Sequence, residues 1–280
     1  MDPRTAATWM LERLRQSVQE KTPGNPAGWG AKCFSQTDED GIIYECLRRL
    51  AEQTSLTRTF IEFGCGDGRE NNTHALVLHG FKGLWIEGGS KNVAYMQEHL
   101  GSIPTSRLRV LAMFVTLETL GDILNNCLSF LGTEEVDFLS MDLDGNDYHF
   151  TQKCLEVFSP KLLCVEYTAK FPPPLKIVMA YNPAHQWVGD DYQGASLQAW
   201  VDGLPGYQLV CCNLSGGNAF FVRRDLLVGF PSYTVEELYQ PPRYTLICGW
   251  QGHAPSLKWL RQSLLEDGAA QDRDEAEAGE

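Results

Sequence analysis

The chain has 280 residues, of which 43% are hydrophobic and 21% charged, so it has ample material for a folded core. Its formal net charge of −13 disfavours nucleic acid as a partner, because phosphate binding needs a basic face. No apolar run has the length of a membrane span, and no signal-peptide core follows Met1. The nine cysteines lack metal-type spacing and favour a reduced, cytoplasmic setting. The sequence gives no indication of the oligomeric state.

The first part of the chain is predicted to be helical. Apolar residues recur at helical spacing over residues 4–20, and the proline-rich segment 23–26 ends that helix. A second helix is expected after Asp40. We therefore predict an N-terminal helical extension over residues 1–58.

Strand and helix patterns then alternate. The expected strands are residues 59–63, 83–87, 107–113, 136–142 and 161–167, and the helices between them are 72–79, 90–100, 117–128 and 148–156. This alternation predicts an α/β, Rossmann-like parallel sheet with helices on both faces. A helix at 195–203 and two strands at 207–212 and 219–223 follow, and the strands are expected to form an antiparallel hairpin. The predicted core spans residues 59–225.

The rhythm breaks over residues 168–194, which are rich in proline, polar and aromatic residues. Such a long irregular stretch inside a compact domain is typical of a binding loop or lid. Its aromatic rings and carboxylates suit a sugar or other polyol, although a plain surface loop has the same mixture. The candidate acceptor contacts in this segment are His185, Trp187, Asp190, Asp191 and Tyr192.

The C-terminal part is expected to add little to the core. Residues 226–265 are predicted to form a helical addition, with one helix at 256–265. From Glu266 to Glu280, seven acidic residues stand against the single basic residue Arg273. We expect residues 266–280 to be a disordered, solvated tail.

A glycine-rich turn joins the first two predicted strands. Glu62 lies at the end of the first strand, Gly64, Gly66 and Gly68 alternate behind it, and Glu87 ends the second strand. Glycines let a backbone turn sharply and approach a bulky ligand, and the second carboxylate can accept hydrogen bonds from a ribose diol. A tight turn in another kind of α/β protein is the alternative.

Acidic residues also follow the fourth and fifth strands. Asp142 and Asp144 could act as general base on an acceptor hydroxyl or orient a ligand's amino group, and with Glu166 they could bind Mg²⁺. The alternative is an Asp-Gly turn in which Asp147 caps the next helix. His149 is a further candidate base, although a histidine in a first helical turn is more often structural.

The alternating glycines resemble motif I of class I S-adenosylmethionine (SAM)-dependent methyltransferases. This resemblance implies that SAM is the cofactor, that Gly64 to Gly68 lie under its amino-acid and ribose part, and that Glu87 holds the ribose hydroxyls. It also implies a seven-stranded sheet in the order 3-2-1-4-5-7-6, with the hairpin at one end.

Over roughly residues 34–225, the segments SQ-x-x-ED, MDLDGNDY, VEY and GGNAFFVRRDL together resemble FkbM-like methyltransferases. Many members are associated with O-methylation of sugars or natural products. The resemblance implies that Gln36 and Asp38 border the cofactor. Glu166 and Tyr167, at the end of the fifth predicted strand, are our candidates for contact with the acceptor. Asp144 departs from the family, in which glutamate is usual.

We therefore predict a SAM-dependent methyltransferase acting on a small acceptor. One alternative is another transferase with the same pocket, such as an aminopropyl transferase that uses decarboxylated SAM. The other is a non-catalytic binding module with this fold.

Overall fold

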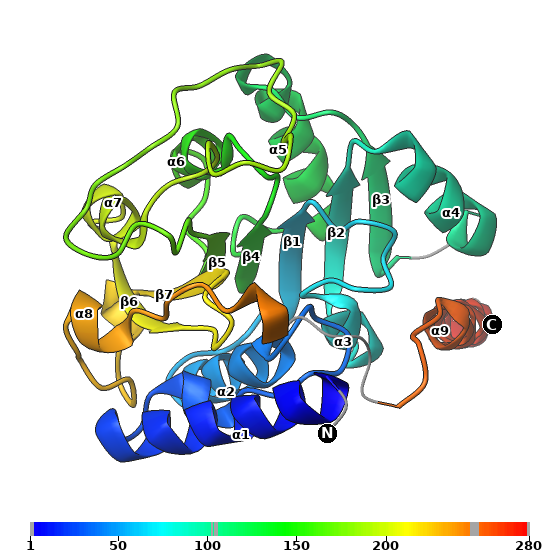
Figure 1. The fold of residues 1–280 in the computed structure, drawn as a ribbon. Helices are drawn as coiled ribbons and strands as arrows, with labels where there is room; N and C mark the ends of the chain where they lie inside the picture. The colour runs from blue at the N-terminus through cyan, green and yellow to red at the C-terminus, as the bar shows by residue number, and fades with distance from the viewer. Residues whose placement is uncertain (1–2, 102, 104–105, 247–251, 279–280) are drawn as a thin grey trace.

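The computed structural model describes residues 3–101, 103, 106–246 and 252–278, whose strands form one seven-stranded sheet. Its order is β3-β2-β1-β4-β5-β7-β6 (Figure 1). The strands are β1 (Thr59–Phe63), β2 (Lys82–Glu87), β3 (Leu108–Ala112), β4 (Phe138–Met141), β5 (Leu162–Glu166), β6 (Tyr207–Cys212) and β7 (Asn218–Arg223). Strands β1 to β5 are parallel, and β7 lies antiparallel between β5 and β6. The predicted mostly parallel sheet with a terminal hairpin is confirmed.

Helices cover both faces of the sheet (Figure 1). One layer contains α1 (Pro3–Lys21), α2 (Glu39–Ala51), α3 (His74–Leu78), α4 (Ser90–Leu100) and α9 (Lys258–Ala278). The other contains α5 (Leu117–Leu131), α6 (Asp147–Leu155), α7 (Leu197–Gly203) and the short α8 (Val235–Leu238). In the described residues, 3₁₀ turns lie at Pro26–Trp29, Arg224–Leu226 and Tyr244–Leu246.

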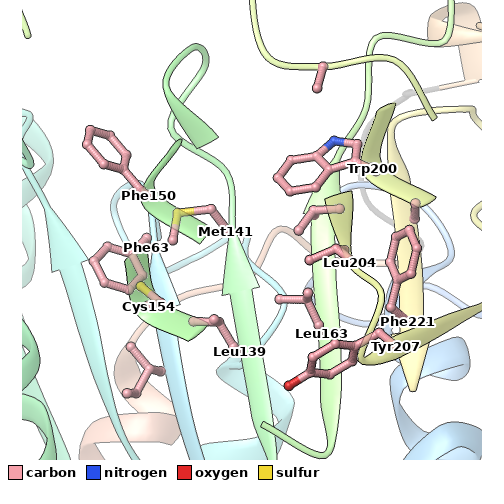
Figure 2. Close-up of a cluster of buried hydrophobic side chains, with 14 of the residues drawn as sticks. Phe63, Leu139, Met141, Phe150, Cys154, Leu163, Trp200, Leu204, Tyr207 and Phe221 are labelled. Carbon is pink, nitrogen blue, oxygen red and sulfur yellow. The ribbon is translucent and has the colours of Figure 1, made fainter. Parts of the chain in front are cut away.

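Alternation along each strand sends side chains into two separate hydrophobic clusters. In β1, Ile61 and Phe63 point to the α5–α6–α7 side, whereas Phe60 points to the α2–α3 side. Figure 2 shows the first cluster, where Phe63 and Met141 from the strands lie near Phe150 of α6. Burying a side chain of this size stabilises the fold by about 1.5–3 kcal/mol, so both faces fix the strand positions.

The irregular segment 168–194 runs along α5 and α6, in yellow-green in Figure 1. It has no helix or strand, only an isolated bridge between Val178 and Ala195. The Asn182 backbone N–H donates to Asn146 at the start of α6, and the Tyr181 hydroxyl accepts from the Leu117 backbone at the start of α5. These contacts hold the segment at the carboxyl end of the sheet.

The C-terminal helix differs from the expected pattern. α9 extends from Lys258 to Ala278, where we expected a helix to residue 265 and disorder beyond it. Alanine and glutamate, both frequent after residue 265, have high helix propensity, which outweighs the lack of apolar residues. None of the helices in the described ranges combines the length and low polarity of a membrane span.

Candidate functional site

The carboxyl ends of β1, β2, β4 and β5 open into a cavity of about 610 Å³. In open α/β sheets ligands bind at this edge, near the point where strand order reverses, here between β1 and β4. The cavity brings together nine of the residues singled out in the sequence: Gln36, Glu62, Gly64, Gly66, Glu87, Asp142, Asp144, Glu166 and His185.

The three alternating glycines have different surroundings. All three have positive φ angles, which L side chains rarely adopt. A methyl group added to Gly64 would lie 1.6 Å from the Asp142 carbonyl oxygen, and one on Gly68 would lie 2.7 Å from the Trp85 ring. At Gly66 it would meet nothing within 4 Å. Gly64 and Gly68 therefore permit close packing, while Gly66 leaves bare backbone at the cavity.

The Glu87 carboxylate is fixed by the backbone on both oxygens. Oε2 accepts from the Gly66 N–H at 2.9 Å, and Oε1 accepts from the Gly89 N–H at 2.6 Å. A carboxylate has about four acceptor positions, so Glu87 keeps acceptor capacity for a ligand in the cavity.

Glu62 is hydrogen-bonded to the residues that follow the glycine turn. Its carboxylate accepts from the Asn72 N–H at 2.8 Å and from the Thr73 hydroxyl, which itself accepts from the Trp85 indole N–H at 2.7 Å. Burial raises the pKa of Glu62 to about 7. Glu62 thus ties the end of β1 to the start of α3 while lining the cavity.

Three further carboxylates, of Asp142, Asp144 and Glu166, have oxygens that all lie within 4.8 Å of one another. In the described part of the chain, no group donates a hydrogen bond to any of the three. Burial raises the pKa of each, and neighbouring carboxylates, including Asp147, raise it further. Asp144 also has a φ of 52°, a conformation that aspartate adopts more readily than most residues.

The cavity as a whole is strongly negative. Its described lining contains no lysine or arginine. Six carboxylates face it, from Glu62, Glu70, Glu87, Asp142, Asp144 and Glu166. A concave site lined by one sign of charge concentrates ligands of the opposite sign, so this cavity suits a cation.

An apolar wall follows β3 and was missed in the sequence. Met113, Phe114 and Val115 line the cavity, as do the apolar residues Leu143 and Phe150. Their position could have identified them as lining residues, because they come directly after a predicted parallel strand, at the same sheet edge as the acidic residues. These side chains offer a surface for a flat, apolar ring.

Two residues of segment 168–194, His185 and Gln186, line the cavity. His185 donates from Nε2 to the Asp144 carbonyl oxygen at 3.1 Å. Its ring also packs on Gly145, where an added methyl group would lie 2.2 Å from Cδ2. The absence of a side chain at Gly145 thus seats His185 over the acidic loop.

Other residues of this segment lie outside the cavity lining. Trp187 donates from its indole to the Asp190 carbonyl oxygen at 2.8 Å, and Asp191 pairs with Lys170. Tyr192 is exposed. They form the outer surface near the site.

Four more predicted site residues also lie outside the lining. His149 donates from Nε2 to the Met179 carbonyl oxygen at 2.8 Å, and the buried Tyr167 hydroxyl donates to that of Gln240 at 2.6 Å. Asp38 is buried and accepts from the Leu214 N–H. Gly68 faces the core, as described above. The first three support neighbouring loops.

Comparisons with known proteins give likenesses of structure only. No family model and no curated protein matches the sequence. An O-methyltransferase from Bacillus cereus in complex with S-adenosylhomocysteine (SAH) has 14% identity and a TM-score of 0.41, over 76% of this chain and 91% of that one. The SAH-bound N-terminal domain of EvdMO1 has 11% identity and a TM-score of 0.42, over 76% and 95%. The glycopeptide N-methyltransferase MtfA with SAM has 13% identity and a TM-score of 0.35, over 63% and 91%.

Proposed function

We propose that the chain is a SAM-dependent methyltransferase. The observation that carries this proposal is the bare backbone at Gly66 beside a Glu87 carboxylate that the turn itself holds in place. Glu87 retains acceptor capacity for the ribose hydroxyls, and Met113 and Phe114 supply a wall for the adenine. The negative lining attracts a cofactor with a sulfonium and an ammonium group.

The acceptor is a small molecule, and the reaction is methyl transfer to one of its hydroxyls, as in a sugar or similar natural product. The hydroxyl oxygen forms the new bond to the methyl carbon while the carbon–sulfur bond breaks, leaving SAH. The proton passes to a carboxylate, for which Asp142 and Asp144 are available in the cavity. His149 donates elsewhere, so we assign this role to the carboxylates.

We further propose residues 59–225 as the catalytic core, with 168–194 as the acceptor loop and with helical parts at 1–58 and 226–265. The packing of His185 on Gly145 supports the role of residues 168–194 as the acceptor loop. The FkbM-like subfamily, the cytoplasmic setting and the solvated end at 266–280 remain expectations from the sequence.

A magnesium ion is another cation that would fit Asp142, Asp144 and Glu166, because hard oxygen ligands surround this point. When bound, it would supply a Lewis acid that lowers the pKa of an acceptor hydroxyl. Activity before and after treatment with a chelator tests this requirement.

Isothermal titration calorimetry tests the proposal. The intact protein is expected to bind SAM and SAH, and Glu87→Ala is expected to weaken SAM binding at least tenfold, because hydrogen bonds to a charged group contribute about 1.5–3 kcal/mol. Glu98→Ala, an exposed carboxylate on α4, is the control and should bind normally. Absence of binding to the intact protein would refute the proposal.

Mass spectrometry of the product separates methyl transfer from aminopropyl transfer by the mass added. A non-catalytic module would bind the cofactor without any product. The open space over Gly66 favours a protein with a ligand.

A further inference from the structure

The six carboxylates of the cavity fall into two groups. Glu62 and Glu87 accept hydrogen bonds from the turn, and Glu70 pairs with Lys32 at 3.2 Å. The second group, Asp142, Asp144 and Glu166, receives no hydrogen bond from any described residue. Asp142 and Glu166 are half-buried and Asp144 is exposed. A carboxylate accepts hydrogen bonds and donates none when ionised, so this second group can bind a positive partner that donates hydrogen bonds.

SAM alone does not supply enough positive charge for that group. Its sulfonium and ammonium are offset by its own carboxylate, which leaves one net positive charge for a cavity with six carboxylates. In the proposed binding mode its ribose lies at Glu87. A second cation bound near Asp142 and Glu166 would therefore meet only acceptor groups of that cluster.

Asn218 adds an independent observation at the same place. It lies directly opposite Glu166 in the β5–β7 ladder, where facing side chains are close neighbours, and it lines the cavity. Its Nδ2 donates to the fully buried Glu39 at 3.2 Å, which commits the nitrogen. Its Oδ1 is shielded from solvent and has no hydrogen-bond partner among the residues that the structure describes. Asn218 is only 6% exposed, so this oxygen is a further acceptor beside the carboxylates.

The orientation of Asn218 is built into the fold. The Glu39 carboxylate accepts a hydrogen bond from Asn218 Nδ2. It also accepts hydrogen bonds from Asn213 Nδ2 at 2.6 Å and from the Thr37 hydroxyl at 3.0 Å. Glu39 begins α2, whereas Asn213 and Asn218 flank the β6–β7 turn. Helix α2 and the hairpin thus cooperate in fixing the Asn218 side chain by its nitrogen, which leaves its oxygen as the available acceptor.

We propose that the acceptor carries an ammonium group near its methyl-accepting hydroxyl, as in an amino sugar or amino alcohol, and that Asp142, Asp144, Glu166 and Asn218 Oδ1 bind this ammonium. This inference rests on the proposed methyltransferase function and names its substrate class. An ammonium has three donors and no acceptor, which matches a cluster made only of acceptors. Phosphorylated and carboxylate-bearing acceptors are disfavoured by the same charge.

Calorimetry on the SAH-saturated protein with three matched sugars tests the proposal. Glucosamine, glucose and glucuronate share one ring and differ in charge. Glucosamine is expected to bind at least tenfold more tightly than glucose, glucuronate is not expected to bind, and added salt should weaken glucosamine binding. Equal binding of all three, preference for glucuronate, or no glucosamine binding at millimolar concentration would overturn the proposal.

Two cavity variants test where the ammonium group of the acceptor binds. Glu166→Gln is expected to lower glucosamine affinity about tenfold while SAH affinity stays unchanged, and Asp144→Asn provides a second variant at an exposed position. Glu156→Gln, an exposed carboxylate after α6, is the matched control. Unchanged glucosamine affinity in both cavity variants would contradict the assignment.

A chelator separates the ammonium from a metal. Glucosamine binding that survives chelation supports the proposal, whereas binding lost with chelator and restored by Mg²⁺ would assign the cluster to a metal. Failure of SAH to bind in the first place would instead refute the methyltransferase function, so the two failures are distinguishable.

Discussion

Gly64 and Gly66 differ in what a side chain would meet, although both have positive φ. Gly66→Ala is expected to fold with a loss of about 1–2 kcal/mol, the cost of a left-handed conformation, but to lose SAM binding because its methyl group occupies the cavity. Gly64→Ala should unfold far more easily, since the clash is with the backbone of Asp142. Urea unfolding and calorimetry measure both effects. Normal SAM affinity in Gly66→Ala would contradict the proposed binding mode.

Two buried carboxylates make stability depend on pH. Burial raises the pKa of Glu62 and of Asp38 to about 7. In the folded state these groups keep protons that the unfolded chain releases from about pH 4 upward, so the free energy of unfolding is highest below that pH and falls toward pH 7. Carboxylates with lowered pKa, such as Asp67, act in the opposite direction and below this window.

We expect the free energy of unfolding to fall by about 5 kcal/mol between pH 5 and pH 8, because each of the two groups loses about 1.36 kcal/mol per pH unit over about two units. Urea unfolding at both values measures the change. Glu62→Gln removes one of the titrating groups, so the variant should show a smaller difference between the two pH values than the unmodified chain. A stability that increases from pH 5 to pH 8 would rule out this explanation.

At the scale of elements, the strands were predictable because they are largely apolar runs, and β2, β4 and β5 end at or next to a carboxylate. The predicted first strand, 59–63, coincides with β1, and the glycine turn and Glu87 follow from it. Helix α3 is shorter than predicted, at His74–Leu78, because Asn72 and Thr73 use their hydrogen-bonding groups on Glu62. Such long-range side-chain bonds have no local signal in the sequence.

The composition of segment 168–194 indicated a binding loop, but it could not show which of its side chains reach the cavity. His185 lines the cavity while Trp187 stays outside, and the segment is held by contacts between residues distant in sequence, such as Asn182 with Asn146 and His185 with Gly145. Asn218 was missed for a related reason. Its role depends on Glu39, which is 179 residues away in sequence.

Contact between His185 and Gly145 gives a prediction about this segment. Gly145→Ala is expected to displace His185, because the methyl group would lie 2.2 Å from the ring, and to loosen residues 168–194. Trypsin should then cleave after the exposed Lys170 and Lys176 several times faster, while SAH affinity stays unchanged. Gly121→Ala, whose methyl group meets nothing within 4 Å, is the control. An unchanged cleavage rate in Gly145→Ala would show that His185 does not anchor the segment.

At the scale of the whole molecule, the N-terminal helices pack against the central sheet. Leu47 of α2 packs in the same cluster as Phe60 of β1, and Glu39 reaches the β6–β7 hairpin. Arg49 of α2 connects still more distant parts, because its Nη1 donates to the carbonyl oxygens of Gly24 at 2.7 Å and Gly229 at 3.0 Å.

The same arginine gives a test of how strongly these parts depend on one another. Arg49 and Glu45 are both nearly buried and pair at 2.7 Å, whereas Arg48, which binds the same carboxylate at 2.8 Å, is 45% exposed. Arg49→Ala is expected to lower the free energy of unfolding by about 1.5–3 kcal/mol, because it removes the charged donor to Glu45 and to the Gly24 and Gly229 carbonyl oxygens, while Arg48 keeps Glu45 paired. Arg48→Ala should cost at most about 1 kcal/mol, as for surface pairs. Urea unfolding measures both losses, and equal small losses would mean that the N-terminal helices contribute little to the stability of the sheet.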